Sequence, residues 1–96
     1  MSRLAQFKFR LYVADDAPNS TLAVANLTEF CRLHLLHRHA IEIVDVLRDP
    51  QRALANGILM TPTLIKLGPM PVRRVVGTLS DPAILLHALG LAPLAA

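Results

Sequence analysis

The chain of 96 residues has one cysteine, Cys31, and no tryptophan. A single cysteine excludes an intramolecular disulfide and the dithiol pair on which thiol–disulfide exchange depends. It fits a protein of the reducing cytosol. The beginning of the chain lacks a continuous apolar segment, because Lys8 and Arg10 interrupt it, so we expect no signal peptide. No apolar run is long enough to span a bilayer. The expected location is therefore cytoplasmic, without a membrane partner.

Aromatic residues are scarce as well, at 4% of a chain that is 53% hydrophobic. Aliphatic side chains must therefore make the core, and the length suits a single domain over residues 1–96. The net charge of +3 permits a nucleic-acid partner. The basic residues are dispersed, however, and no aromatic residues lie between them to stack on bases. We therefore expect a solvated basic surface and no nucleic acid.

Sequence signatures of catalysis are missing too. No Ser-His-Asp arrangement, pair of catalytic carboxylates or glycine-rich phosphate loop is visible, so we expect neither an enzyme nor a cofactor. Asp15 and Asp16 are two adjacent carboxylates without further oxygen ligands, which is weak support for a cation site. They are more typical of a solvated turn at the start of a helix, where acidic residues complement the helix dipole.

Four possible metal ligands stand close together in the sequence: Cys31, His34, His37 and His39. Their side chains cannot all converge on one ion from a straight helix, and the sequence holds no second ligand cluster. We therefore expect no metal. Cys31 falls on the apolar stripe of its helix and is interpreted as a small buried hydrophobic residue. Histidines near the end of that helix favourably oppose its dipole.

Hydrophobic periodicity, with Gly and Pro as breakers, predicts four strands and three helices. They are a strand over residues 7–14, a helix from Pro18 to about His37, a mostly buried strand over residues 41–47, a short helix from Asp49-Pro50 to about Ala55, strands over residues 63–67 and 72–76, and a last helix from Ser80-Asp81-Pro82 with the apolar stripe Ile84, Leu85, Ala88 and Leu89. The last two strands form a hairpin, because Gly68-Pro69-Met70-Pro71 lies between them.

The order βαβαββα predicts an α/β sandwich. The first two strands should be parallel by the right-handed crossover rule, with helices covering both faces of the sheet. This order is similar to the thioredoxin-like fold. Pro62 follows Thr61 at the start of a strand, where such folds place a cis-proline, so Pro62 is the candidate for one.

Several stretches together resemble the KaiB family of bacterial circadian clock proteins, over about residues 7 to 91. The combination is specific, although no single short stretch would be. These stretches are Leu11-Tyr12-Val13-Ala14 with Pro18-Asn19-Ser20, Val44-Asp45-Val46 with Pro50, Thr61-Pro62-Thr63-Leu64 with Lys66, and Pro71-Val72-Arg73-Arg74-Val75-Val76-Gly77 with Leu79-Ser80.

The resemblance implies a non-catalytic protein that binds a KaiC-like ATPase ring and modulates its phosphorylation state or output. A KaiA-like protein and a sensor histidine kinase are further partners that the family suggests. KaiB-like proteins also switch fold in the C-terminal half. One state is thioredoxin-like and usually monomeric, and the other assembles as homodimers or homotetramers.

Four residues are candidates for binding a partner. Arg73 and Arg74 point to opposite faces of an antiparallel hairpin, so one of them should present outward. In the family that the chain resembles, such a basic ridge engages acidic surfaces, a role that suits arginine because it pairs carboxylates bidentately. Lys66 belongs to the same group, and ordinary solubilising charges are the alternative. Asp45 either pairs with one of these residues or caps a loop.

Ala88 and Gly90 are candidates for setting the fold state, since Ala88-Leu89-Gly90 stands where the family has Gly-Leu-Asp. Alanine favours a helix over glycine by about 1 kcal/mol, so Ala88 should favour the thioredoxin-like state. The basic charge and the absence of an acidic tail indicate a divergent homologue. Two other functions stay open: a sensor-type domain that regulates a histidine kinase, and a redox-inactive thioredoxin-like stress adaptor.

Overall fold

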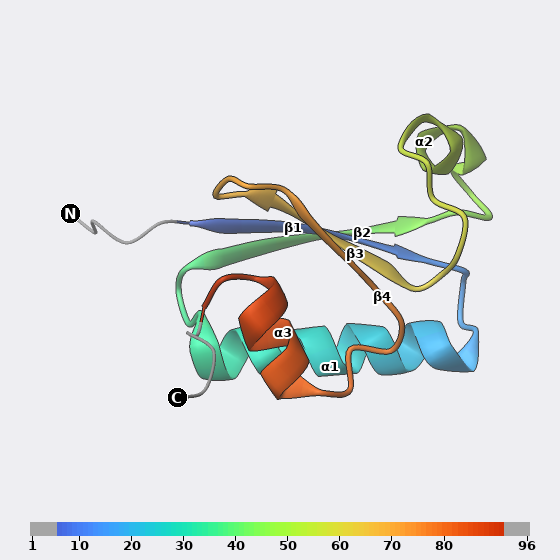
Figure 1. Ribbon diagram of the computed structural model, residues 1–96. Helices are drawn as coiled ribbons and strands as arrows, with labels where there is room; N and C mark the ends of the chain where they lie inside the picture. The colour runs from blue at the N-terminus through green and yellow to red at the C-terminus, as the bar shows by residue number, and fades with distance from the viewer. Residues whose placement is uncertain (1–5, 92–96) are drawn as a thin grey trace.

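The computed structural model describes residues 6–91, which fold around one mixed sheet. The elements follow the βαβαββα order predicted from the sequence (Figure 1). In chain order they are β1 (Phe7–Val13), α1 (Pro18–His34), β2 (His39–Asp45), α2 (Pro50–Ala55), β3 (Thr63–Gly68), β4 (Arg73–Val76) and α3 (Pro82–Ala88).

The sheet has the strand order β2-β1-β3-β4. β1 pairs in parallel with β2 through the α1 crossover, as the right-handed crossover rule predicts. On its other side β1 pairs antiparallel with β3, and β3 pairs antiparallel with β4. The hairpin predicted around the Gly/Pro cluster is confirmed, and Thr61-Pro62 is a cis peptide bond, as expected.

The main core lies on one face of the sheet. β1 alternates along its first half, so Phe7, Phe9 and Leu11 point to the same side and are buried there. Figure 1 shows α1 and α3 packed together beneath this face. They contribute buried aliphatic and aromatic side chains, among them Leu27, Phe30, Leu85 and Leu89. The core is largely aliphatic, as the composition requires.

The opposite face is covered only in part, which corrects the expectation that helices cover both faces. A smaller cluster joins Tyr12, Val44 and Ile65 of the sheet to Ala53 of α2 and Ile58 after it. Because α2 has only six residues, it reaches one end of the sheet, as Figure 1 shows at the upper right. The side chains of Lys8 and Arg74 are left exposed.

Two expected boundaries are wrong. α1 ends at His34 and does not reach His37, which has a positive φ of 63° in the connection. β2 begins at His39 and ends at Asp45, and only Val44 in it is buried. β2 is less buried than expected because it is an edge strand with one neighbour in the sheet. A run of β-branched residues suits an edge strand as well as a central one.

Both ends of α3 are capped, the start by Asp81 and the end by the turn at Gly90. The Asp81 carboxylate accepts hydrogen bonds from the backbone N–H of Ala83 at 3.0 Å and of Ile84 at 3.4 Å. At the other end Gly90 has φ 72°, its N–H donates to His87, and the N–H of Leu91 donates to Leu86. These two bonds form a Schellman motif, which requires the left-handed conformation that glycine adopts freely.

Candidate functional site

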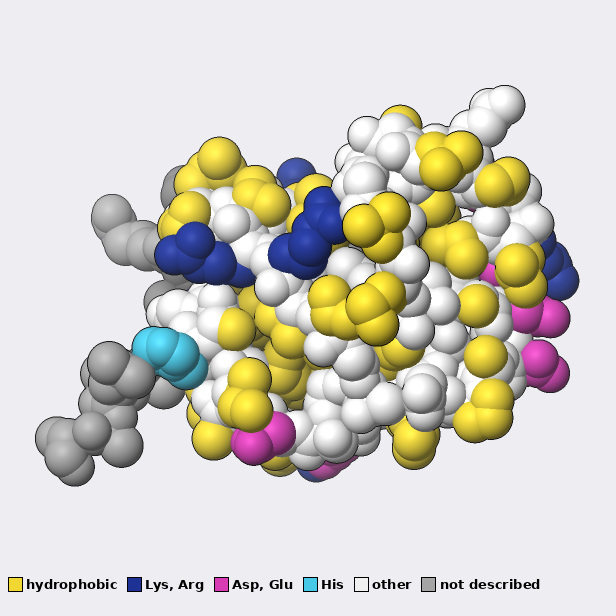
Figure 2. Space-filling model, turned by 45° about the vertical axis from the view of Figure 1, so that its right-hand side comes forward, with side chains coloured by type: hydrophobic (Ala, Val, Ile, Leu, Met, Phe, Trp, Pro, Cys, Tyr) yellow, Lys and Arg dark blue, Asp and Glu magenta, His cyan; other side chains and the backbone are white. Residues whose placement is uncertain are grey.

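Segment 47–60, which contains α2, exposes four large apolar side chains: Leu47, Leu54, Leu59 and Met60. Leu59 is 93% exposed, so it has almost no packing role within the chain. The segment leads into the cis peptide at Pro62, at the end of the sheet that α2 covers. Figure 2 shows hydrophobic side chains exposed on the α2 side of the molecule, next to Lys and Arg side chains. Exposed apolar side chains gathered around one element are typical of a protein-binding surface.

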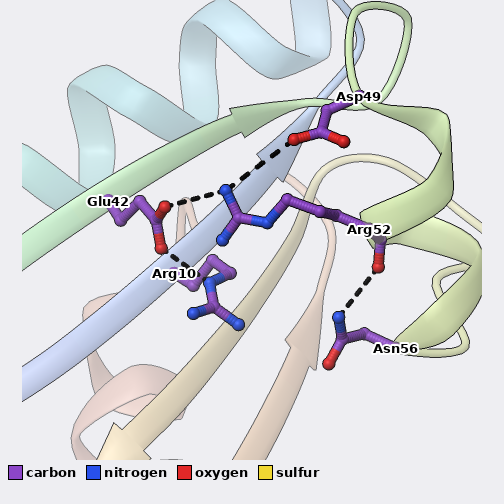
Figure 3. Close-up of polar contacts among 5 residues, drawn as sticks. All are labelled: Arg10, Glu42, Asp49, Arg52 and Asn56. Atoms are coloured by element: carbon purple, nitrogen blue, oxygen red, sulfur yellow. Dashed lines mark hydrogen bonds and ion pairs between the residues drawn. The ribbon is translucent and has the colours of Figure 1, made fainter.

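A network of ion pairs connects α2 to the sheet, as Figure 3 shows. The Glu42 carboxylate on β2 accepts from Nε of Arg10 on β1 at 2.8 Å and pairs with Nη1 of Arg52 on α2 at 2.9 Å. The same Arg52 nitrogen lies 3.9 Å from the Asp49 carboxylate. At the C-terminal end of α2, the side-chain amide of Asn56 donates to the Arg52 carbonyl at 2.8 Å. One carboxylate therefore joins three elements.

The pKa of Glu42 is lowered from its ordinary value of 4.5 to about 2 by hydrogen bonds from Arg52 and then Arg10. Because the folded pKa lies below the unfolded value, Glu42 contributes stability above pH 4.5, which is lost as the pH falls toward about 2. Its side chain is 47% exposed, so solvent screens the pair and the contribution is small. We expect a carboxyl NMR titration to give a pKa well below 4.5 that rises in Arg52→Gln. An unchanged midpoint in that variant would contradict the pairing.

Arg73 and Arg74 are both exposed, and in β4 they pair with Lys66 and Ile65 respectively. The Arg74 guanidinium donates to the backbone carbonyls of Gly57 at 3.1 Å and Asn56 at 2.8 Å. Arg74 therefore contacts the C-terminal end of α2, while Arg73 lies on the opposite face of the hairpin. Binding of a partner by either arginine stays a prediction.

Lys66 is buried, at 4% exposure, which corrects the expectation of an exposed ridge that includes it. Its ammonium Nζ lies 3.4 Å from the carbonyl of Leu89 at the end of α3 and 5.8 Å from the centre of the Phe7 ring. Burial lowers the pKa of Lys66, and the charge of Arg73 lowers it further. A cation suits the C-terminus of a helix, so Lys66 stabilises the docked α3 in this fold.

Asp45 caps loops, one of the two roles that the sequence left open. Its Oδ1 accepts from the backbone N–H of Asp15 at 3.1 Å and of Leu47 at 2.9 Å. Its Oδ2 lies 3.5 Å from Nε of Arg48. The carboxylate thus joins the carboxyl ends of β1 and β2, and it pairs with none of Lys66, Arg73 and Arg74 among the ion pairs of residues 6–91.

The cysteine and histidines do not form one centre. Cys31 is buried in the core, and this burial raises the pKa of its thiol to about 11. The His34 ring lies 4.7 Å from that of Phe30, and Nδ1 of His39 is 2.8 Å from the Leu35 carbonyl. Within residues 6–91, no group of three or more His, Cys, Asp or Glu residues is placed to hold a metal ion. None of the helices in that range could cross a membrane.

Sequence patterns did not predict the ion pairs of Arg10, Glu42 and Arg52. The available signal was Glu42, an acidic residue inside an apolar strand, but its partners lie 32 residues away on β1 and on the following helix. The parallel register, which places Arg10 opposite Glu42, follows only from the folded sheet.

The fold and the site together define a thioredoxin-like protein whose first helix begins with Pro18-Asn19 and whose one thiol is buried. Two solved structures have this fold. The N-terminal domain of SasA from Synechococcus elongatus matches with TM-score 0.74 and 21% identity, over 96% of this chain and 90% of that one. Mitochondrial thioredoxin 3 from Saccharomyces cerevisiae matches with TM-score 0.70 and 13% identity, over 92% and 80%.

The chain belongs to the KaiB family. The model of the KaiB domain matches residues 10–91. The circadian clock oscillator protein KaiB of Synechococcus elongatus is 42% identical over 81 residues, which are 84% of this chain and 79% of that protein. The circadian clock protein KaiB3 of a Synechocystis species is 39% identical over 84 residues, or 88% and 82%. The resemblance seen in the sequence is confirmed.

Proposed function

We propose that this chain is a non-catalytic regulator of the circadian-clock type, which binds a KaiC-like ATPase ring and modulates its phosphorylation state or output. The observation that carries the proposal is the KaiB domain match over residues 10–91, together with relatives named as circadian clock proteins. A regulator of this kind acts through its surface and needs no catalytic group. The cytoplasmic location and the single domain over residues 1–96 stay predictions.

The surface proposed for the ring combines apolar and basic side chains. Leu54, Leu59 and Met60 supply exposed apolar area around α2, and Arg74 supplies positive charge from the neighbouring strand β4. Arg73, on the opposite face of the hairpin, is proposed to contact the ring beside this surface. A few well-packed side chains at the centre of a protein interface contribute most of the affinity, and charges at the rim set the association rate and the choice of partner. A KaiA-like protein remains a further proposed partner.

The test is size-exclusion chromatography with light scattering, on the chain alone and then with a KaiC homologue and nucleotide. A chain that shifts onto the ring would support the proposal. A chain that binds the ring under no nucleotide condition would contradict it and leave the fold unaffected. Binding to a histidine kinase and not to the ring would instead favour the sensor-type alternative, which at present has only the fold likeness to SasA in its support.

The fold state is the second part of the proposal: we infer that Ala88 favours the thioredoxin-like state. Ala88 is the last residue of α3, directly before the capped end at Leu89 and Gly90. Ala88→Gly should therefore weaken α3 by less than the helix-interior value of about 1 kcal/mol and increase the share of dimers or tetramers. Chromatography of both proteins at several concentrations measures this share. An unchanged distribution, with the expected loss of stability, would show that residue 88 does not set the fold state.

A further inference from the structure

α2 is too short to be stable alone. It has six residues, and isolated helices shorter than about 12–15 residues are marginal in water. Of its own side chains only Ala53 is buried, and Ile58 adds a second apolar contact after the helix ends. Ala53 and Ile58 are the only buried side chains of segment 47–60, which leaves Leu54 and Leu59 in solvent. Contacts beyond this apolar packing therefore help to hold α2 on the sheet.

Arginines from three elements supply these contacts. At the start of α2, Arg52 pairs with Glu42, which Arg10 also holds from the central strand β1 (Figure 3). At the other end, Arg74 of β4 donates to the carbonyls of Asn56 and Gly57. The carbonyls at the end of a helix lack partners within it and favour a cation. Both ends of α2 are thus attached to the sheet by charged groups.

Glu42 is the carboxylate that connects Arg10 to Arg52. It is the only acidic residue that the ion pairs of residues 6–91 connect to two arginines on different elements. Without its charge, Arg10 and Arg52 would be two cations facing one another across the contact between β1 and α2. Removing Glu42 therefore replaces attraction with repulsion at this contact.

We infer that Glu42 is a positioning residue, which holds α2 on the sheet and so presents the exposed apolar side chains of segment 47–60 to a protein partner. The partner half of this inference, that the docked α2 is needed for binding, rests on the proposed function. The structural half, that Glu42 holds α2 on the sheet, concerns the free chain alone. When α2 leaves the sheet, the exposed apolar side chains of segment 47–60 lose their fixed positions. The affinity for the partner then falls, although Glu42 itself need not touch the partner.

Hydrogen exchange on the free chain tests the structural half. The amides of Asn56, Gly57 and Ile58 donate to carbonyls of α2 and report its opening. In Glu42→Gln we expect these amides to exchange about 3- to 10-fold faster, with no change at Leu11 in the central strand. Raising NaCl from about 0.05 M to about 1 M should accelerate the same amides in the parent chain and not in the variant.

Glu29→Gln is the matched control, because Glu29 pairs with Arg32 on the surface of α1 and not with α2. It should leave the exchange of Asn56, Gly57 and Ile58 unchanged. Unchanged exchange in Glu42→Gln would overturn the inference. Equal acceleration at Leu11 would also overturn it, because Glu42 would then act on overall stability.

Two further measurements separate this inference from the proposed function. Combining Glu42→Gln with Arg52→Gln should accelerate exchange by less than the product of the single effects, and independent effects would contradict the pairing. In the partner assay, Glu42→Gln should weaken binding to the KaiC homologue in inverse proportion to the fraction of the chain in which exchange shows α2 still docked. An affinity that does not follow this docked fraction would overturn the partner half. If the parent chain does not bind, the proposed function fails, and the exchange data alone decide the role of Glu42.

Discussion

Leu85→Ala is expected to lower the free energy of unfolding by about 2–5 kcal/mol. Leu85 is 1% exposed and joins α3 to the main core, together with Leu89. Truncation removes buried apolar area and leaves a cavity that a short helix fills poorly. Small domains have about 5–15 kcal/mol of stability in total, so the loss is a large part of it. Denaturation in urea, followed by circular dichroism, measures the change through the midpoint at constant slope.

Ile84→Ala is the control for this prediction. Ile84 precedes Leu85 in the same helix but is 59% exposed, which corrects its place in the apolar stripe expected from the sequence. Its replacement should change stability by less than about 0.5 kcal/mol, since it is a surface substitution and alanine suits a helix. Equal losses in both variants would mean that α3 does not pack on the sheet through Leu85.

Sequence patterns predict the elements whose causes are local, although they did not separate the exposed Ile84 from the buried Leu85. Alternation in β1 and the Gly/Pro cluster in the hairpin predict these elements because their causes are local. The start of α3 is predicted for the same reason, since Asp81 and Pro82 act within one turn. Local patterns therefore predict the element order and most of the main core.

What the sequence did not reveal depends on contacts between distant residues. The burial of Lys66 comes from Phe7 at the start of the chain and Leu89 near its end. The role of Arg74 depends on the carbonyls of Asn56 and Gly57, which α2 brings next to β4. A charged residue in a strand predicts exposure by default, and only tertiary structure shows which one is covered.

The last prediction concerns affinity for the KaiC-like ring: Leu59→Asp should weaken it by about 10- to 100-fold. Leu59 is 93% exposed and makes almost no contact within the chain, so the substitution should leave the stability of the free protein nearly unchanged. In the complex, however, a carboxylate would be buried in an apolar contact, which is costly without a partner charge. Titration of labelled chain with the ring and nucleotide measures the dissociation constant.

Leu22→Asp is the control, because Leu22 is a leucine of α1, on the other face of the sheet from α2, and is 52% exposed. A loss of affinity with Leu22→Asp alone would move the binding surface to α1 and contradict the assignment to segment 47–60. A loss with Leu59→Asp alone would place it there. Comparison with Glu42→Gln would also separate two kinds of residue. Leu59→Asp should change affinity without changing the exchange of α2, whereas Glu42→Gln should change the exchange and, through the docked fraction, the affinity.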